Sequence, residues 1–86
     1  MPAISMFYGI IISMYNNGEH NPPHFHAYYQ GHNAVFDMDG VKKEGEMPNR
    51  QIKLIAAWAE IHRDELLANW ELAMKEQPLF KIDPLR

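Results

Sequence analysis

The sequence HFHAYYQGHNAVFDMD, residues 24–39, decides the fold because it has the pattern of a β-hairpin. Aromatic and β-branched residues suit pleated strands at 24–30 and 33–39. The dipeptide between them, Gly31 and His32, indicates a tight turn, since glycine readily takes the positive φ that such turns require. The pattern therefore predicts two antiparallel strands.

A further strand is expected on the N-terminal side of this hairpin, at residues 5–15. This segment is rich in aromatic and β-branched residues, with apolar side chains on both faces. The sequence NNGEHNPP, 16–23, then interrupts the pattern with turn-forming residues. After the hairpin, DGVKKEGE, 39–46, is expected to be a polar loop.

The C-terminal half has the period of a helix. Ile52, Ile55 and Ala59 recur on one face from Asn49 onward, and the apolar stripe is interrupted by HRDE, 62–65. We favour two helices, with Asp64 capping the second, or one helix kinked at 62–64. The alternative is one long helix with a polar patch on its outer face. Proline 78 ends the helical segment, and the tail LFKIDPLR, 79–86, is expected to be extended and to dock on the core through its apolar residues.

The predicted fold class is α+β in a single domain spanning 1–86. The strands lie within 5–39, the helical segment covers about 49–77 and the extended tail covers 78–86. We expect a small antiparallel sheet of about three strands, with one face covered by the C-terminal helix or helix pair.

Composition narrows the classes of function. The chain of 86 residues has a formal net charge of −3, so it is not expected to bind nucleic acid when alone. Cysteine is absent, which excludes a disulfide framework and a thiolate zinc site. The apolar start lacks a basic leading segment and is too short to span a membrane, so we expect a cytoplasmic protein without a membrane partner.

A cluster of histidines in EHNPPHFH, 19–26, is a candidate metal site. His24 and His26 share a face of the predicted strand, and His20 lies on the preceding turn. Three imidazoles bind zinc or a similar divalent metal, and Glu19, Asp37 or His62 could complete the site. Alternatively, these residues form an ordinary turn and a solvent-facing strand, or a surface that contacts a partner without metal.

Two further groups are candidates for function. His62, Arg63 and Asp64 are a candidate catalytic set for acid–base or ribonuclease-like chemistry, although a helix junction with capping residues and a surface ion pair is the favoured explanation. Tyr28 and Tyr29 place one ring on each face of the strand, so one is expected to be exposed at a partner-binding surface.

Four stretches together resemble a small bacterial family, domain-of-unknown-function family 4160. They are MPAISMFYGIIISMY (1–15), HNPPHFHAYY (20–29), WAEIHRDELLANWELA (58–73) and PLFKIDPL (78–85). The resemblance covers nearly the whole chain and rests on the spacings H-x-P-P-H-x-H and W-x-x-x-H-x-x-E-L-x-x-N-W. The stretch NNG at 16–18 departs from the family pattern, where a shorter turn is expected.

The resemblance implies a partner more clearly than an activity. Members of the family are often encoded beside a second small protein, of domain-of-unknown-function family 2442, in an arrangement similar to a toxin–antitoxin pair. The first hypothesis is therefore one component of a two-gene module that acts by protein–protein interaction; a homo-oligomer is also possible. The alternative is a metalloprotein, hydrolase or ribonuclease-like toxin that uses His20, His24 and His26.

Overall fold

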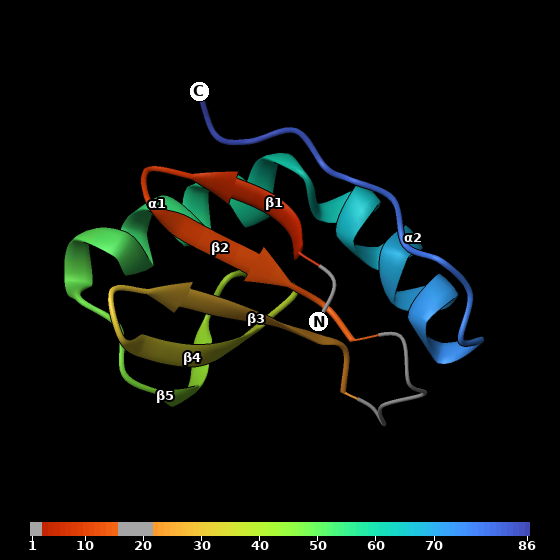
Figure 1. Cartoon of the computed structure of the whole chain (residues 1–86), viewed down its shortest axis with the longest axis horizontal. Helices are drawn as coiled ribbons and strands as arrows, with labels where there is room; N and C mark the ends of the chain where they lie inside the picture. The colour runs from red at the N-terminus through yellow and green to blue at the C-terminus, as the bar shows by residue number, and fades with distance from the viewer. Residues whose placement is uncertain (1–2, 16–21) are drawn as a thin grey trace.

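The computed structural model describes residues 3–15 and 22–86, which form an antiparallel sheet followed by two helices (Figure 1). The five strands are paired in chain order, each with the next. In sequence, the elements are β1 (Ala3–Phe7), β2 (Ile10–Ser13), β3 (His24–Tyr29), β4 (His32–Asp37), β5 (Lys42–Gly45), α1 (Asn49–Ile61) and α2 (Arg63–Met74). The predicted α+β class with an antiparallel sheet and a helix pair is confirmed.

The prediction of about three strands is wrong, because the described residues form five. The segment predicted as one strand, 5–15, is the hairpin of β1 and β2, with Phe7 paired to Ile10. Tyr8 and Gly9 connect these residues at φ values of 48° and 79°. Positive φ at both positions is the geometry of a two-residue hairpin turn. The turn brings Phe7 and Ile10 to the same buried face. This explains why apolar residues occur at both odd and even positions of the segment 5–15.

The second unpredicted strand, β5, lies within the segment expected to be a polar loop. Its residues Lys42–Gly45 lack hydrophobic alternation because this strand is at the edge of the sheet, where charged side chains face solvent. Gly45 is required at the pairing with β4. At its φ of 86°, a Cβ atom would lie 2.2 Å from the carbonyl oxygen of Asn33.

The central hairpin of β3 and β4 confirms the two predicted strands, with the turn one residue earlier than expected. Gln30 and Gly31 take φ values of 42° and 84°, so His32 already belongs to β4. On the buried face, Phe25 is opposite Phe36, and their stacked rings have centroids 5.7 Å apart.

The helical segment is divided at His62, as the interrupted apolar stripe predicted. Helix α1 follows Pro48 and ends at Ile61, and α2 begins at Arg63. Asp64 does not cap α2 but lies with Glu65 in its first turn, where negative charge interacts favourably with the helix dipole. The predicted kink is therefore correct, and the predicted cap is not.

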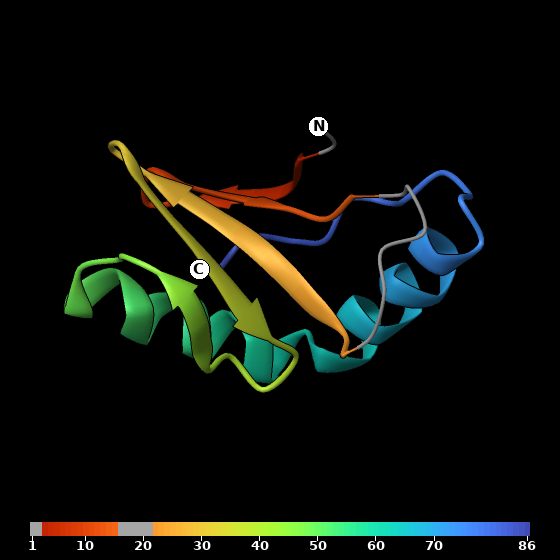
Figure 2. The same ribbon diagram turned by 90° about the horizontal axis from the view of Figure 1, so that it is seen from below.

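Both helices lie on the same side of the sheet (Figure 2). The core between these layers centres on Trp58 of α1, which is fully buried. Its ring centroid is 5.3 Å from that of Phe7 and 5.8 Å from that of Phe25. Because α1 and α2 cover only one side, the other side of the sheet is left without a helical layer.

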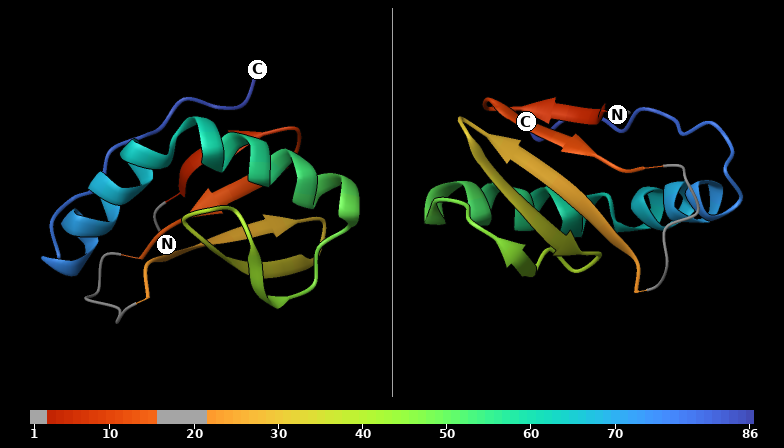
Figure 3. Two further views of the ribbon diagram at one scale, coloured as in Figure 1. Left: turned by 180° about the vertical axis from the view of Figure 1, so that it is seen from behind. Right: turned by 60° about the horizontal axis from the view of Figure 1, so that its bottom comes forward.

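The extended tail returns along α2 and passes beside β1 (Figure 3). The buried side chain of Asn69 donates a hydrogen bond to the carbonyl of Phe80 and accepts one from its amide. The indole of Trp58 donates to the carbonyl of Asp83, and the amide of Ile82 donates to the carbonyl of Ile4. Of the apolar tail residues, Ile82 is buried, as docking predicted, whereas Phe80 is exposed.

Candidate functional site

Alternate residues of the central strands stand on the side of the sheet that the helices leave uncovered. Ile11 of β2 is opposite Tyr28 of β3, and Ser13 is opposite His26. Val35 of β4 is opposite His26 on its other side. We call this surface the open face; its residues are Met6, Ile11, Ser13, Tyr15, His24, His26, Tyr28, Val35, Asp37 and Glu44. His24 lies at its end nearest α2, where the ring centroid of His24 is 5.1 Å from that of Trp70.

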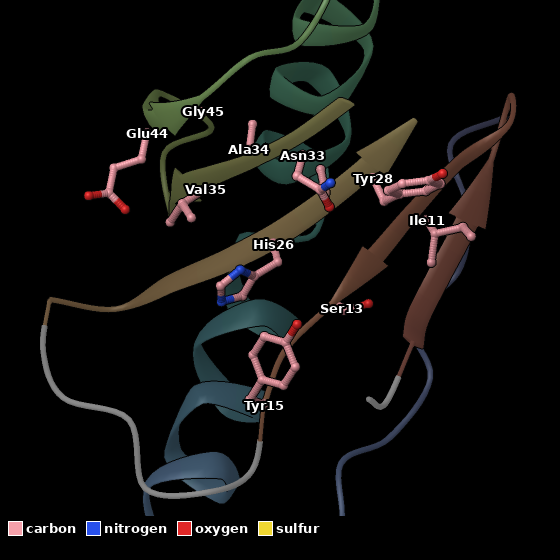
Figure 4. Close-up of a pocket in the computed structure, with 11 residues that line it drawn as sticks. Ile11, Ser13, Tyr15, His26, Tyr28, Asn33, Ala34, Val35, Glu44 and Gly45 are labelled. Carbon is pink, nitrogen blue, oxygen red and sulfur yellow. The ribbon is translucent and has the colours of Figure 1, made fainter. Parts of the chain in front are cut away.

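Two adjoining hollows lie on the open face. The first has a volume of about 570 Å³, and its walls include Ile11, Tyr28 and Val35 (Figure 4). The second, of about 780 Å³, extends toward His24 and Asp37. Both hollows share His26, Val35 and Glu44, so together they form one shallow groove across β2 to β5.

The two histidines of β3 lie side by side where the hollows meet. Their ring centroids are 5.3 Å apart, and the rings of His26 and Tyr15 form a T-shaped pair with centroids 4.6 Å apart. His24 Nδ1 lies 2.9 Å from the carbonyl oxygen of Pro22. Because a carbonyl can only accept, this hydrogen bond places a proton on Nδ1 of His24. The prediction that His24 and His26 share a face is confirmed.

The third member of the predicted metal set, His20, lies outside the described residues, as does Glu19. Within the part of the chain that the structure describes, no three histidine or carboxylate side chains are grouped closely enough to hold a metal ion. Neither Asp37 nor His62 therefore completes a site with His24 and His26. Zinc binding by His20, His24 and His26 stays a prediction.

Asp37 serves the turn between β4 and β5. Its carboxylate accepts hydrogen bonds from the backbone amides of Asp39, at 2.9 Å, and Val41, at 3.0 Å. Burial alone would raise the pKa of Asp37. The amides of Val41 and Asp39 and the ammonium of Lys43, 3.6 Å away, outweigh burial and hold this pKa below its usual value. The negative charge of Asp37 is thus balanced by these two amides and by Lys43.

Glu44 is the other carboxylate of the open face, and it lines both hollows. The described ion pairs join Lys43 to Asp37, Arg63 to Asp39 and His62 to Glu65. None of them involves Glu44. Among the described residues, the groove therefore has apolar and aromatic walls and one carboxylate, Glu44, outside these ion pairs, while Lys43, which also lines the second hollow, pairs with Asp37.

The predicted catalytic residues are adjacent in sequence but do not converge. His62 Nδ1 lies 2.6 Å from a carboxylate oxygen of Glu65, and its ring packs near Trp58. Arg63 instead pairs with Asp39 at 3.3 Å. Asp64 lines a separate hollow, of about 560 Å³, on α2. What the structure brings together is a His62–Glu65 pair at the helix junction, away from the two hollows of the open face.

The two adjacent tyrosines have different surroundings. Tyr28 stands on the open face with 43% of its surface exposed. Tyr29 points to the other side, where it packs against the core and lies beside Gly9. The alternation of the strand therefore correctly predicts one exposed tyrosine. Tyr28 is the member of the predicted partner-binding pair that is available at the open face.

Several open-face residues were not predicted from the sequence. The alternation of 10–15 does place Ile11, Ser13 and Tyr15 on one face. However, a single strand over 5–15 would put Phe7 on that same face, whereas Phe7 is buried on the core side. Glu44 carried no signal, because its strand has neither hydrophobic alternation nor β-branched residues.

The comparison with family models matches residues 9–71 to the domain of unknown function DUF4160. The chain belongs to this family. Because the match spans β2 to most of α2, it includes both histidines of β3, Tyr28 and Glu44. Searches among curated proteins and among solved structures found no match to the chain.

The helices of this DUF4160 domain do not reach the length and apolar character of a membrane span anywhere in the described residues. Its candidate site is the open face, which presents both the histidine pair and an apolar groove.

Proposed function

We propose that this DUF4160 protein binds a small partner protein through the open face of its sheet, as one component of a two-gene module similar to a toxin–antitoxin pair. The observation that carries the proposal is the exposed, mainly apolar groove on the side of the sheet without helices. The resemblance that implies a partner encoded nearby supplies the candidate partner.

The composition of the groove suits a protein partner. Tyr28 and Ile11 provide contact area in the first hollow, and Met6, with 61% of its surface exposed, continues the apolar strip onto β1. Aromatic residues and methionine are enriched at the centres of protein interfaces, whereas charged residues are depleted there. Glu44 stands at the edge of the strip, where a charge serves orientation more than affinity.

Co-expression with the product of the adjacent gene tests the proposal. We expect a complex that survives size-exclusion chromatography. The substitution Tyr28→Ala should weaken it about tenfold or more, because it removes an aromatic side chain from the centre of the interface. Ile61→Ala is the matched control: Ile61 is 66% exposed but lies at the end of α1. Failure of the wild-type proteins to associate would refute the proposal.

A second function is favoured by the paired histidines of β3. Two adjacent imidazoles, one with its tautomer fixed by a carbonyl, are suited to metal binding. This alternative includes a hydrolase or ribonuclease-like toxin. Metal analysis of untagged protein tests it, together with the melting temperature in zinc. His24→Ala should abolish any zinc-dependent stabilisation and His32→Ala should not, because His32 begins β4 outside the cluster.

A further inference from the structure

Tyr8 occupies a backbone position that disfavours its side chain. It is the first of the two turn residues between β1 and β2, with φ of 48°. Two-residue turns of this kind favour asparagine, aspartate or glycine, because a bulky side chain at positive φ is sterically strained. The β3–β4 hairpin has Gln30 at the equivalent position, with φ of 42°.

No contact within the described part of the chain compensates Tyr8 for this strain. The residue is 61% exposed, and neither its ring nor its hydroxyl takes part in a described ring contact or hydrogen bond. It lies two residues after Met6, which is opposite Ile11 at the β1 end of the open face. A strained and exposed aromatic residue in the turn at the β1 end of the open face is expected where a second molecule contacts the ring.

Charge indicates which molecule this is. The chain has a net charge of −3, and Glu44 in the groove has no cation in the described ion pairs, while Lys43 is already paired with Asp37. A second copy of this chain would bring like charges together across the interface. A different protein with a basic rim around an apolar recess complements both the Tyr8 ring and Glu44.

We infer that Tyr8 is an anchor residue of the partner interface and inserts its ring into an apolar recess of a partner protein with a positively charged contact surface. This inference rests on the proposed binding through the open face. It extends that interface from the groove to the β1–β2 turn.

The test compares Tyr8→Asn with the matched variant Gln30→Asn. Both substitutions place the favoured residue in an equivalent turn, so each should raise the melting temperature, with about 4 °C expected for Tyr8→Asn. Binding to the co-expressed product of the adjacent gene should fall about tenfold or more for Tyr8→Asn and stay within about twofold for Gln30→Asn. Tyr8→Phe should keep most of the affinity, since it retains the ring.

The outcomes separate this inference from the proposed function. If Tyr8→Asn binds the partner as tightly as the wild type does, the inference is overturned but the proposed function is not. A lower melting temperature for Tyr8→Asn would also overturn it, because the ring would then stabilise the fold. A homodimer weakened by Tyr8→Asn would overturn the assignment of a basic partner. The absence of any wild-type complex would overturn the proposed function and the inference with it.

Discussion

The carboxylate of Asp37 shows how a single residue shapes the site. It accepts hydrogen bonds from the backbone amides of Asp39 and Val41, and these bonds hold the turn that returns the chain as β5. Without that turn, Glu44 would not reach the groove. The sequence predicted only a polar loop at 39–46, because the partners of Asp37 depend on the path of the backbone and were not predictable from spacing.

The depressed pKa of Asp37 predicts an acid-sensitive contribution to stability. The contribution is complete above the unfolded pKa of about 3.9 and is lost as the pH falls through the lower folded value. Asp37→Asn should lower the free energy of unfolding at neutral pH by about 1 kcal/mol, because an amide oxygen is the weaker acceptor. It should also reduce the decline in stability below about pH 4.

Urea unfolding at neutral pH and through the acid range measures both effects. Glu46→Gln is the control, since Glu46 is exposed and lies outside the described ion pairs. An acid decline as steep in Asp37→Asn as in the wild type would contradict the assigned role.

At the scale of elements, the spacing of hydrophobic residues predicted the strands and helices that have one face in the core and one in solvent. The hairpin of β3 and β4 and the division of the helices at His62 belong to this group. The β1–β2 turn and β5 were missed for two different reasons. Tyr8 does not resemble a turn residue, and β5 is held by its backbone pairing with β4 and by Gly45, with no apolar pattern of its own.

The tail depends on Asn69 of α2, which is fully buried and forms both of its hydrogen bonds with the backbone of Phe80. Asn69→Ala should destabilise the protein by about 2 kcal/mol or more, because it leaves the amide and carbonyl of Phe80 without their partner. That loss corresponds to a fall in melting temperature of roughly 8 °C or more. Thermal unfolding followed by circular dichroism measures it.

Gln77→Ala is the control for the tail, because Gln77 is exposed and its side chain forms only a long hydrogen bond, of 3.4 Å, to Lys75. It should change the melting temperature little. Equal effects of the two substitutions would show that Asn69 does not hold the tail.

At the scale of the whole molecule, the two-layer arrangement leaves one face of the sheet without a helical layer, and this is the face that we propose binds a partner. The sequence predicted the covering of one face by the helices, and it placed His24, His26 and Tyr28 together on one side of β3. It did not predict the groove, because the groove also needs Ile11, Val35 and Glu44 from three other strands. Their alignment depends on the register between strands, which only the folded sheet defines.

The central claim is that this open face, and not the helical layer, binds the partner. Methyl NMR during titration with the product of the adjacent gene tests it most directly. We predict that the signals of Met6, Ile11 and Val35 shift or broaden on binding, while those of Ile61 and Met74 on the helices stay unchanged. Perturbation of Ile61 and Met74, with Met6, Ile11 and Val35 unaffected, would contradict the account.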